Sequence, residues 1–292
     1  MMGRRRTRSE IDDMRATLYA LLDADHPQSV RHLFYLMTDP RLRCAVEKSE
    51  NGYRHVQYQL SEMRKAGLVP YNWIVDATRM GYHVATYDGT SDFIRKTAGH
   101  YRANAWDSAE AYAEVWCESR SIASVIANDC HELGVSLYPS GGFASLTLPY
   151  DAAQQISRFV GGTDKSIEII YVGDYDPAGV LIDVDIEAKL RKHLIDDFSV
   201  TNRLTFHRLA ITRDQISVYR LPTKPRRTGD RRALHIAETV EAEAMPARML
   251  RRLLREKVEN FMPEGALSAA KAAEEFERAG LARIAELIER DR

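Results

Sequence analysis

The chain has 292 residues, of which 45% are hydrophobic and 28% charged, and its 41 basic and 42 acidic residues leave a net charge of -1. This balance is typical of a soluble globular protein and excludes a disordered, fibrous or low-complexity chain. The length favours two domains over one. A near-neutral charge also excludes a global basic field, so binding to nucleic acid would have to come from local patches.

Two short basic clusters are candidates for such patches. A solvated tail and a solvated loop explain them equally well. The first cluster lies at the N-terminus and the second in a stretch rich in Pro and Gly: Arg4, Arg5, Arg6 and Arg8, then Arg220, Lys224, Arg226, Arg227, Arg231 and Arg232.

The cysteine pattern and the lack of long apolar runs bear on the compartment. Cys44, Cys117 and Cys130 form no C-x-x-C pair and have no histidines at zinc-ligand spacing, which argues against a disulfide framework and a structural zinc. No apolar stretch follows the basic N-terminus, and nowhere do about 18 uncharged apolar residues run together. We therefore expect a cytoplasmic protein without a membrane partner.

The N-terminal third is predicted to be mainly helical. Apolar spacing predicts helices over residues 9–22, 29–36 and 53–66, with Ser29 as a cap of the second and Gly67 as the end of the third. Three short helices suggest a helix-turn-helix arrangement. Residues 68–75 change to an extended character, broken by Pro70. Residues 78–106 are mixed and are interpreted as the end of this unit plus a connection.

The rest of the chain alternates strands and helices. Strands are predicted over 113–117, 135–138, 167–172 and 204–211, and helices over 119–133, 150–159 and 180–194. The run 167–172 is nearly all apolar, as in a central strand buried on both faces. Residues 246–292 are predicted to form one or two helices with polar faces. The alternation predicts an α/β fold with an open, mostly parallel sheet, whose functional crevice lies at the carboxyl ends of the strands.

Three acidic residues follow strands of this predicted sheet. Glu118 comes directly after the first strand, and Asp174 and Asp176 follow the third, so we expect them to converge at one edge. Hard carboxylate oxygens suit Mg²⁺, which offsets phosphate charge in phosphoryl chemistry. Two simpler explanations stay open: Glu118 favours the positive N-terminus of the next helix, and Asp174 caps the helix that follows it.

The motif residues also carry a family resemblance. VWCE at 115–118 and DYDPAG at 174–179 resemble the Toprim signature of topoisomerases, primases and some nucleases. A winged-helix unit ahead of such a domain is similar to the A subunit of topoisomerase VI and to the meiotic break-making transesterases, over roughly residues 27–215. The resemblance implies that Glu118, Asp174 and Asp176 bind Mg²⁺, with Mn²⁺ as an alternative, and that Glu118 is catalytic.

A tyrosine carries the family's nucleophilic role. The stretch SVRHLFY at 29–35 is similar to the family pattern T-x-R-D-I-Y-Y, which implies Tyr35 as the nucleophile and Arg31 as its neighbouring arginine; His32 and Phe34 depart from the pattern. A phenol of pKa about 10 needs a base or a cation to become a nucleophile. An aromatic residue at this spacing on an amphipathic helix is equally a core residue, and both interpretations stay open.

The resemblance implies a domain organisation and a function. We expect a basic helical segment over 1–26, a winged-helix DNA-binding domain over 27–106, a Toprim domain over 107–245 and a helical segment over 246–292. The expected function is Mg²⁺-dependent cleavage of double-stranded DNA, by tyrosine transesterification or by metal-activated hydrolysis. No P-loop is present, so an ATPase or motor would be a separate subunit, and the family implies a homodimer. The alternative is a non-catalytic DNA-binding regulator or replication accessory.

Several further charged residues have weaker assignments. The acidic ones would be additional carboxylates around the metal site, and the basic ones, on the third helix, would contact DNA phosphates or bases. For both groups, a solvated helix face is the alternative explanation. These residues are Asp183, Glu187, Glu241, Glu243, Arg54, His55, Arg64 and Lys65.

Overall fold

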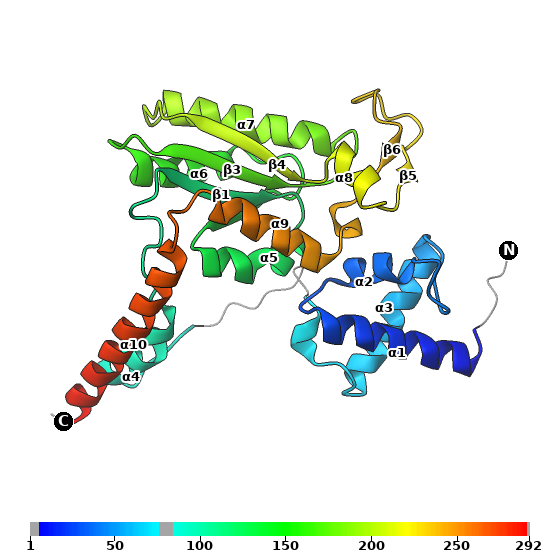
Figure 1. The fold of residues 1–292 in the computed structure, drawn as a ribbon, viewed down its shortest axis with the longest axis horizontal. Helices are drawn as coiled ribbons and strands as arrows, with labels where there is room; N and C mark the ends of the chain where they lie inside the picture. The colour runs from blue at the N-terminus through cyan, green and yellow to red at the C-terminus, as the bar shows by residue number, and fades with distance from the viewer. Residues whose placement is uncertain (1–5, 76–83, 291–292) are drawn as a thin grey trace.

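The protein is described by a computed structural model that covers residues 6–75 and 84–290. A group of three helices leads into a layered α/β unit, and two further helices, one from the middle of the chain and one from its end, pack side by side (Figure 1). The α/β fold class and the helical C-terminal segment are as predicted. Of the helices in the described part, none combines the length and the hydrophobicity of a membrane span.

The N-terminal group consists of α1 (Arg8–Ala24), α2 (Val30–Met37) and α3 (Glu50–Lys65). The three predicted helices are confirmed, but α3 begins earlier than expected because Ser49 caps it, its hydroxyl accepting from the Gly52 amide at 3.2 Å. Ser29 caps α2 as predicted. The apolar face of α1 packs against α2 and α3, so all three helices share one core.

The extended run predicted over residues 68–75 is wrong in its middle. Tyr71–Trp73 form a 3₁₀ turn, η1, which begins directly after Pro70. The chain then returns to Gln28, whose amide donates to the Trp73 carbonyl at 3.0 Å and whose carbonyl accepts from the Val75 amide at 3.0 Å. A single bridge to a loop residue therefore replaces the expected strand.

The residues interpreted as a connection contain a helix that their sequence did not indicate. Part of that stretch, residues 76–83, lies outside the described residues. Beyond it come α4 (Thr90–Thr97) and η2 (Ala98–His100). The helix α4 packs along α10 (Ala266–Arg290), as Figure 1 shows, and Arg95 pairs there with Glu289. Of the eight residues of α4 only Ser91 is buried, and a helix this short is marginal by itself, so packing against α10 stabilises it.

A four-stranded parallel sheet with the order β2-β1-β3-β4 forms the centre of the molecule. The four strands match the predicted ones closely, and β3 is a central strand as expected, but the helix α8, Arg213–Val218, was not predicted. The strands are β1 (Ala111–Cys117), β2 (Ser136–Pro139), β3 (Ser166–Val172) and β4 (Leu204–Ala210). The helices are α5 (Arg120–Leu133), α6 (Thr147–Val160), α7 (Gly179–Asp196), α8 (Arg213–Val218) and α9 (Ala247–Glu259).

Helices cover both faces of this sheet. Along β3, Ile167, Ile169 and Tyr171 belong to the core cluster shared with α6 and α7. Ile170 and Val172 point the other way and join the cluster of α5 and α9, as the two-residue period of a strand requires. This second cluster is continuous with the core of the N-terminal helices, so the N-terminal helices and the sheet pack as neighbours.

The segment after α8 returns to the carboxyl edge of the sheet. It contains the two-residue strands β5 (Lys224–Pro225) and β6 (Glu238–Thr239) and the 3₁₀ helix η3 (Ala242–Ala244). The loop between β5 and β6 contains most of the second basic cluster. Arg226 donates there to the carbonyls of Ile236 and Arg232, at 3.2 and 3.0 Å, so this arginine holds the loop together.

One carboxylate lies within the sheet itself. Glu114 on β1 is fully buried, and it accepts from the Tyr112 hydroxyl at 2.9 Å and the Trp116 indole N–H at 3.0 Å. Burial raises the pKa of this carboxyl to about 7, against the two hydrogen bonds, which lower it. Near neutral pH, Glu114 therefore changes charge inside the core.

Replacing Glu114 by Gln should remove a pH dependence of stability. Because the folded-state pKa is raised, this group's contribution is fully present below the unfolded pKa and is lost as pH rises through about 7. We expect the free energy of unfolding of the wild type to fall by on the order of 3 kcal/mol between about pH 5 and pH 9 from this group. A glutamine amide can accept from Trp116 and donate to Tyr112, so Glu114→Gln should lack this decline.

Urea unfolding at several pH values measures the effect. The matched control is Glu277→Gln, an exposed position on α10, which should follow the wild-type profile. Parallel profiles for Glu114→Gln and the wild type would show that Glu114 does not titrate in this range.

Candidate functional site

The ends of two neighbouring strands bring three carboxylates to one edge of the sheet. Cys117 on β1 lies opposite Val172 on β3, so the residues that follow leave the sheet side by side. The Asp174 amide donates to Glu118 Oε2 at 3.1 Å. The charge of Asp176 also acts on Glu118. The convergence that the sequence predicts for Glu118, Asp174 and Asp176 is therefore found in the structure.

The backbone engages one oxygen of each of these carboxylates. Asp174 Oδ1 accepts from the Ala242 amide at 2.8 Å. Asp176 Oδ1 accepts from the amides of Ala178 at 2.8 Å and Gly179 at 2.6 Å, directly ahead of the first turn of α7. Ala178 occupies the N-cap position of α7 and no side chain caps it, so the capping role considered for Asp174 is wrong. Within the described residues, no donor contacts the second oxygen of any of the three.

A strap over residues 240–244 crosses this edge. Val240 and Tyr175 exchange backbone hydrogen bonds of 2.8 and 2.9 Å, and the Ala242 amide binds Asp174. Glu243 is buried and accepts from the Ser119 hydroxyl at 3.3 Å. The strap thus places Glu243 among the carboxylates, which sequence periodicity could not do.

Burial and mutual repulsion shape the electrostatics of the cluster. Burial raises the pKa of Asp174 well above its usual range, and the charges of Glu118 and Glu243 raise it further. The pKa of Glu118 is raised by burial and by the charge of Asp176, against the Asp174 N–H, which lowers it. Burial likewise raises the pKa of Glu243. A bound cation would relieve this repulsion.

Arg208 on β4 holds the acidic loop from the other side. Its guanidinium donates to Asp183 Oδ2 at 2.5 Å, to the Gly179 carbonyl at 3.2 Å and to the Asp174 carbonyl. It also lies over the Tyr171 ring, 5.5 Å from the centroid. Arg208 was not among the predicted site residues; its signal in the sequence is a charged residue within a strand that helices cover on both faces.

The two acidic residues singled out on α7 separate in the structure. Asp183 binds Arg208 beside the acidic loop. Glu187 instead pairs with Arg191 at 2.6 Å, one turn further along α7. Of the two, only Asp183 supports the site.

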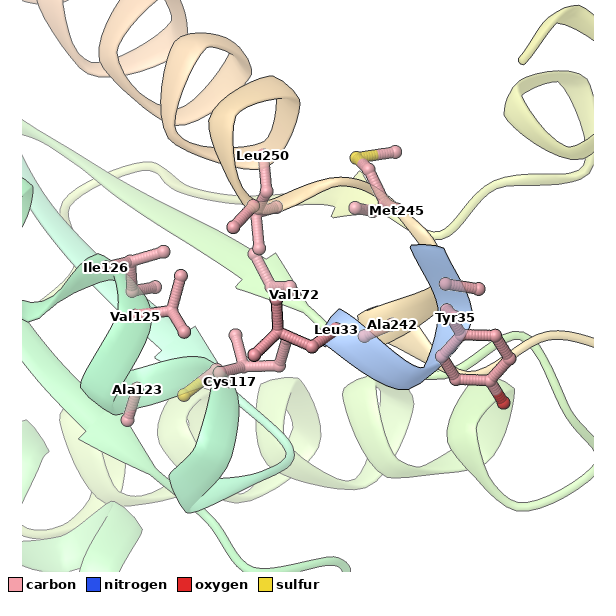
Figure 2. Packing of buried hydrophobic residues seen from close by; sticks show 14 of the residues in the cluster. Leu33, Tyr35, Cys117, Ala123, Val125, Ile126, Val172, Ala242, Met245 and Leu250 are labelled. Carbon is pink, nitrogen blue, oxygen red and sulfur yellow. The ribbon is translucent and has the colours of Figure 1, made fainter. Parts of the chain in front are cut away.

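Tyr35 and Arg31 reach the opposite side of the strap. Arg31 Nη1 donates to Glu241 Oε2 at 2.5 Å, and Lys224 Nζ donates to Glu241 Oε1 at 2.6 Å. The Tyr35 ring packs at the margin of the hydrophobic cluster, with its oxygen directed away from Leu33 (Figure 2). Glu241 therefore connects the strap to α2.

The environment of Tyr35 opposes ionisation. Its side chain is 6% exposed. Burial raises the pKa of the phenol, and the negative charge of Glu241 raises it further, whereas Arg31 lowers it. In this conformation Tyr35 is a neutral phenol and part of the core.

The charged residues of α3 form local contacts. Arg54 pairs with Glu50 at 3.3 Å and Lys65 with Glu62 at 2.9 Å, both in exposed positions. Arg64 donates to the Tyr71 carbonyl at 2.9 Å. Burial lowers the pKa of His55. These contacts are those of a solvated helix face, and they leave Arg54 and Lys65 exposed.

The donor set allows a cation without forming a complete ligand shell. Across residues 6–75 and 84–290, no three His, Cys, Asp or Glu side chains are arranged as metal ligands. Glu118, Asp174 and Asp176 each keep one oxygen without a protein donor in the described part of the chain. Mg²⁺ prefers hard oxygen ligands such as these carboxylates, and it completes its coordination shell with water molecules. These three residues are therefore the ones that could hold it.

Comparisons with protein-family models, with curated proteins and with solved structures find no match to this chain.

The start of α7 allows a test of how tightly the acidic loop is packed. A Cβ on Gly179 would lie 2.3 Å from the Asp174 carbonyl oxygen, so Gly179→Ala must displace the loop. We expect a loss of about 1–3 kcal/mol in the free energy of unfolding. The control is Gly280→Ala in α10, where a Cβ meets nothing within 4 Å and should stabilise the helix by up to about 1 kcal/mol. Chemical denaturation of the wild type and both variants measures these changes. A Gly179→Ala variant as stable as the wild type would contradict the close packing of the loop.

Proposed function

We propose that this chain is a Mg²⁺-dependent DNA-cleaving protein, with a winged-helix-like N-terminal unit and a Toprim-like α/β unit. The observation that carries the proposal is the meeting of Glu118, Asp174 and Asp176 at the carboxyl edge of a parallel sheet, each with one oxygen that no donor among residues 6–75 and 84–290 contacts. Ligands bind at this edge of open α/β sheets. The VWCE and DYDPAG motifs occupy the same edge.

Each group has a role in this proposal. Glu118, Asp174 and Asp176 would hold Mg²⁺ or Mn²⁺, which when bound offsets the charge of the scissile phosphate. Arg208 and the Ala242 amide keep the acidic loop in place. Arg31, on the α2 side of the strap, would contact a phosphate oxygen, since guanidinium groups pair well with phosphates.

Two nucleophiles are compatible with this site. Water is favoured by the burial of Tyr35 and the raised pKa of its phenol. Tyrosine transesterification is the second candidate, favoured by the two lysine ammonium groups that lie over the Tyr35 ring, at 5.5 and 5.8 Å from its centroid. For Tyr35 to act, α2 would have to expose the hydroxyl and a base would have to accept its proton.

We also propose the partners that such an activity needs. Double-stranded DNA would be the substrate, and a second copy of the chain would cut the second DNA strand. An ATPase or motor would be a separate subunit. We propose a cytoplasmic location, because all three cysteines are free thiols in the structure and the cytoplasm keeps thiols reduced. A DNA-binding protein without cleavage activity is the rival function, favoured by the two backbone amides that already engage Asp176 Oδ1.

Cleavage of supercoiled plasmid is the direct test. The wild type with Mg²⁺ or Mn²⁺ should give nicked or linear DNA, and Asp174→Asn should reduce the rate by about 100-fold or more, since metal-site chemistry supplies several kcal/mol. Glu187→Gln, on the same helix side as Asp183 but paired with Arg191, is the control and should cleave normally.

Tyr35→Phe separates the two nucleophiles. If DNA ends remain bound to protein until protease is added, and Tyr35→Phe abolishes cleavage, tyrosine attacks. Free ends that Tyr35→Phe leaves unchanged mean that water attacks. Binding of DNA without cleavage under all these conditions would exclude cleavage by this chain alone and favour the non-catalytic function.

Metal binding can be tested without DNA. At Mg²⁺ tenfold above its dissociation constant, we expect about 1.4 kcal/mol of stabilisation, seen as a rise in the melting temperature. Asp174→Asn should lose this rise, while Glu187→Gln keeps it. Equal Mg²⁺-induced shifts in the wild type and Asp174→Asn would place the metal elsewhere.

A further inference from the structure

A small hollow opens where α2, the start of α3 and β5 meet. Its volume is about 150 Å³, and its lining includes the side chains of Arg31, Lys48 and Lys224 together with the ring of Tyr53. We call this feature the basic hollow. It lies on the α2 side of the strap and is separate from the cluster of Glu118, Asp174 and Asp176.

The cations of the basic hollow outnumber the carboxylates that face them. Arg31 and Lys224 share the single carboxylate of Glu241, at 2.5 and 2.6 Å. Glu50 at the rim is 71% exposed and pairs with Arg54 at 3.3 Å. The result is an excess of positive charge in a partly buried place.

Lys48 shows that this excess is not neutralised. Its ammonium donates to the Thr223 carbonyl at 2.8 Å, and it forms no ion pair with a carboxylate of the described residues. Burial and the charge of Lys224 lower the pKa of Lys48 to about 8, against Glu241, which raises it. A bound anion would offset the repulsion between the two lysines.

The surroundings of the basic hollow suit an anion in two further ways. Both lysine ammonium groups lie over the Tyr35 ring, and the Arg31 guanidinium lies over the Tyr53 ring, 5.3 Å from its centroid. These rings hold the cations in place. The N-terminus of α3, which begins at Glu50 after the cap Ser49, also borders the hollow and adds its positive dipole end.

We propose that the basic hollow binds one phosphate group of the DNA backbone, held by Lys48, Lys224 and Arg31 beside Tyr35. The proposal rests on the proposed function and names a phosphate contact outside the metal site. Two lysines and an arginine around one point provide charge-assisted hydrogen bonds to a phosphate without reading base sequence.

The test measures DNA binding in EDTA, where cleavage plays no part. A fluorescent duplex is titrated at several salt concentrations with the wild type and with the double variant Lys48→Gln, Lys224→Gln. The double variant should bind more weakly, and its dependence of log affinity on log salt should be shallower by about one to two units. The matched control is Lys192→Gln, Lys271→Gln, two exposed lysines on α7 and α10, which should leave the slope unchanged.

A second arm distinguishes a backbone phosphate from a free one. Melting temperatures are compared in sodium phosphate and in sodium chloride of equal ionic strength. If phosphate stabilises the wild type but not the double variant, and the wild type binds no DNA, the hollow takes free phosphate and the DNA proposal is overturned. Lys48→Arg, which keeps the charge, should retain most of the wild-type binding.

Unchanged DNA affinity and salt slope in the double variant, with an unchanged melting temperature in chloride, would overturn the phosphate site. Because the assay contains no metal, this result would leave the cleavage proposal intact. Conversely, loss of cleavage in Asp174→Asn with normal salt slopes would leave the basic hollow intact.

Discussion

The parallel pairing of β1 with β3 is the constraint on which the candidate site depends. Its register sets Cys117 opposite Val172, and the chain then turns so that Glu118 accepts a hydrogen bond from the Asp174 amide. Two acids are thereby held close together in a partly buried place, which is electrostatically costly. A shift of this register by one residue would exchange the two faces of β3, whose different side chains pack into two separate core clusters.

The backbone and Arg208 offset part of that cost. Glu118, Asp174 and Asp176 each accept at least one backbone N–H. The guanidinium of Arg208 binds the acidic loop through Asp183 and two carbonyls. The loop is thus fixed before any cation binds. Because the loop is already ordered, a cation could bind to these carboxylates without a further loss of loop entropy.

The strap over residues 240–244 relates the two regions of interest. Glu241 faces Arg31 and Lys224, while the next residue, Ala242, donates its amide to Asp174. A phosphate in the basic hollow and a cation at the carboxylates would therefore contact opposite sides of one short segment. Tyr35 lies on the phosphate side, where its ring packs in the core and supports the two lysines.

Much of the secondary structure follows from the sequence alone. The spacing of apolar residues predicts the helices and strands of the α/β unit and the position of Glu118, Asp174 and Asp176 after their strands, and Ser29 predicts the start of α2. Such signals are local, since a cap or an apolar stripe depends on residues within one or two turns. The predicted convergence at one edge follows from the parallel connection, which is itself a local pattern.

The tertiary structure alone decided the remaining features. The run after Gly67 forms η1 because it pairs with Gln28, and α4 is stabilised by α10 from the far end of the chain. Arg31 and Glu241 are 210 positions apart. Lys48 and Lys224 likewise meet only because the loop before α3 reaches the start of β5, where Lys48 donates to the Thr223 carbonyl. No periodicity links such residues, because their proximity results from how whole elements pack, and the burial and charge that give each site its chemistry exist only after that packing.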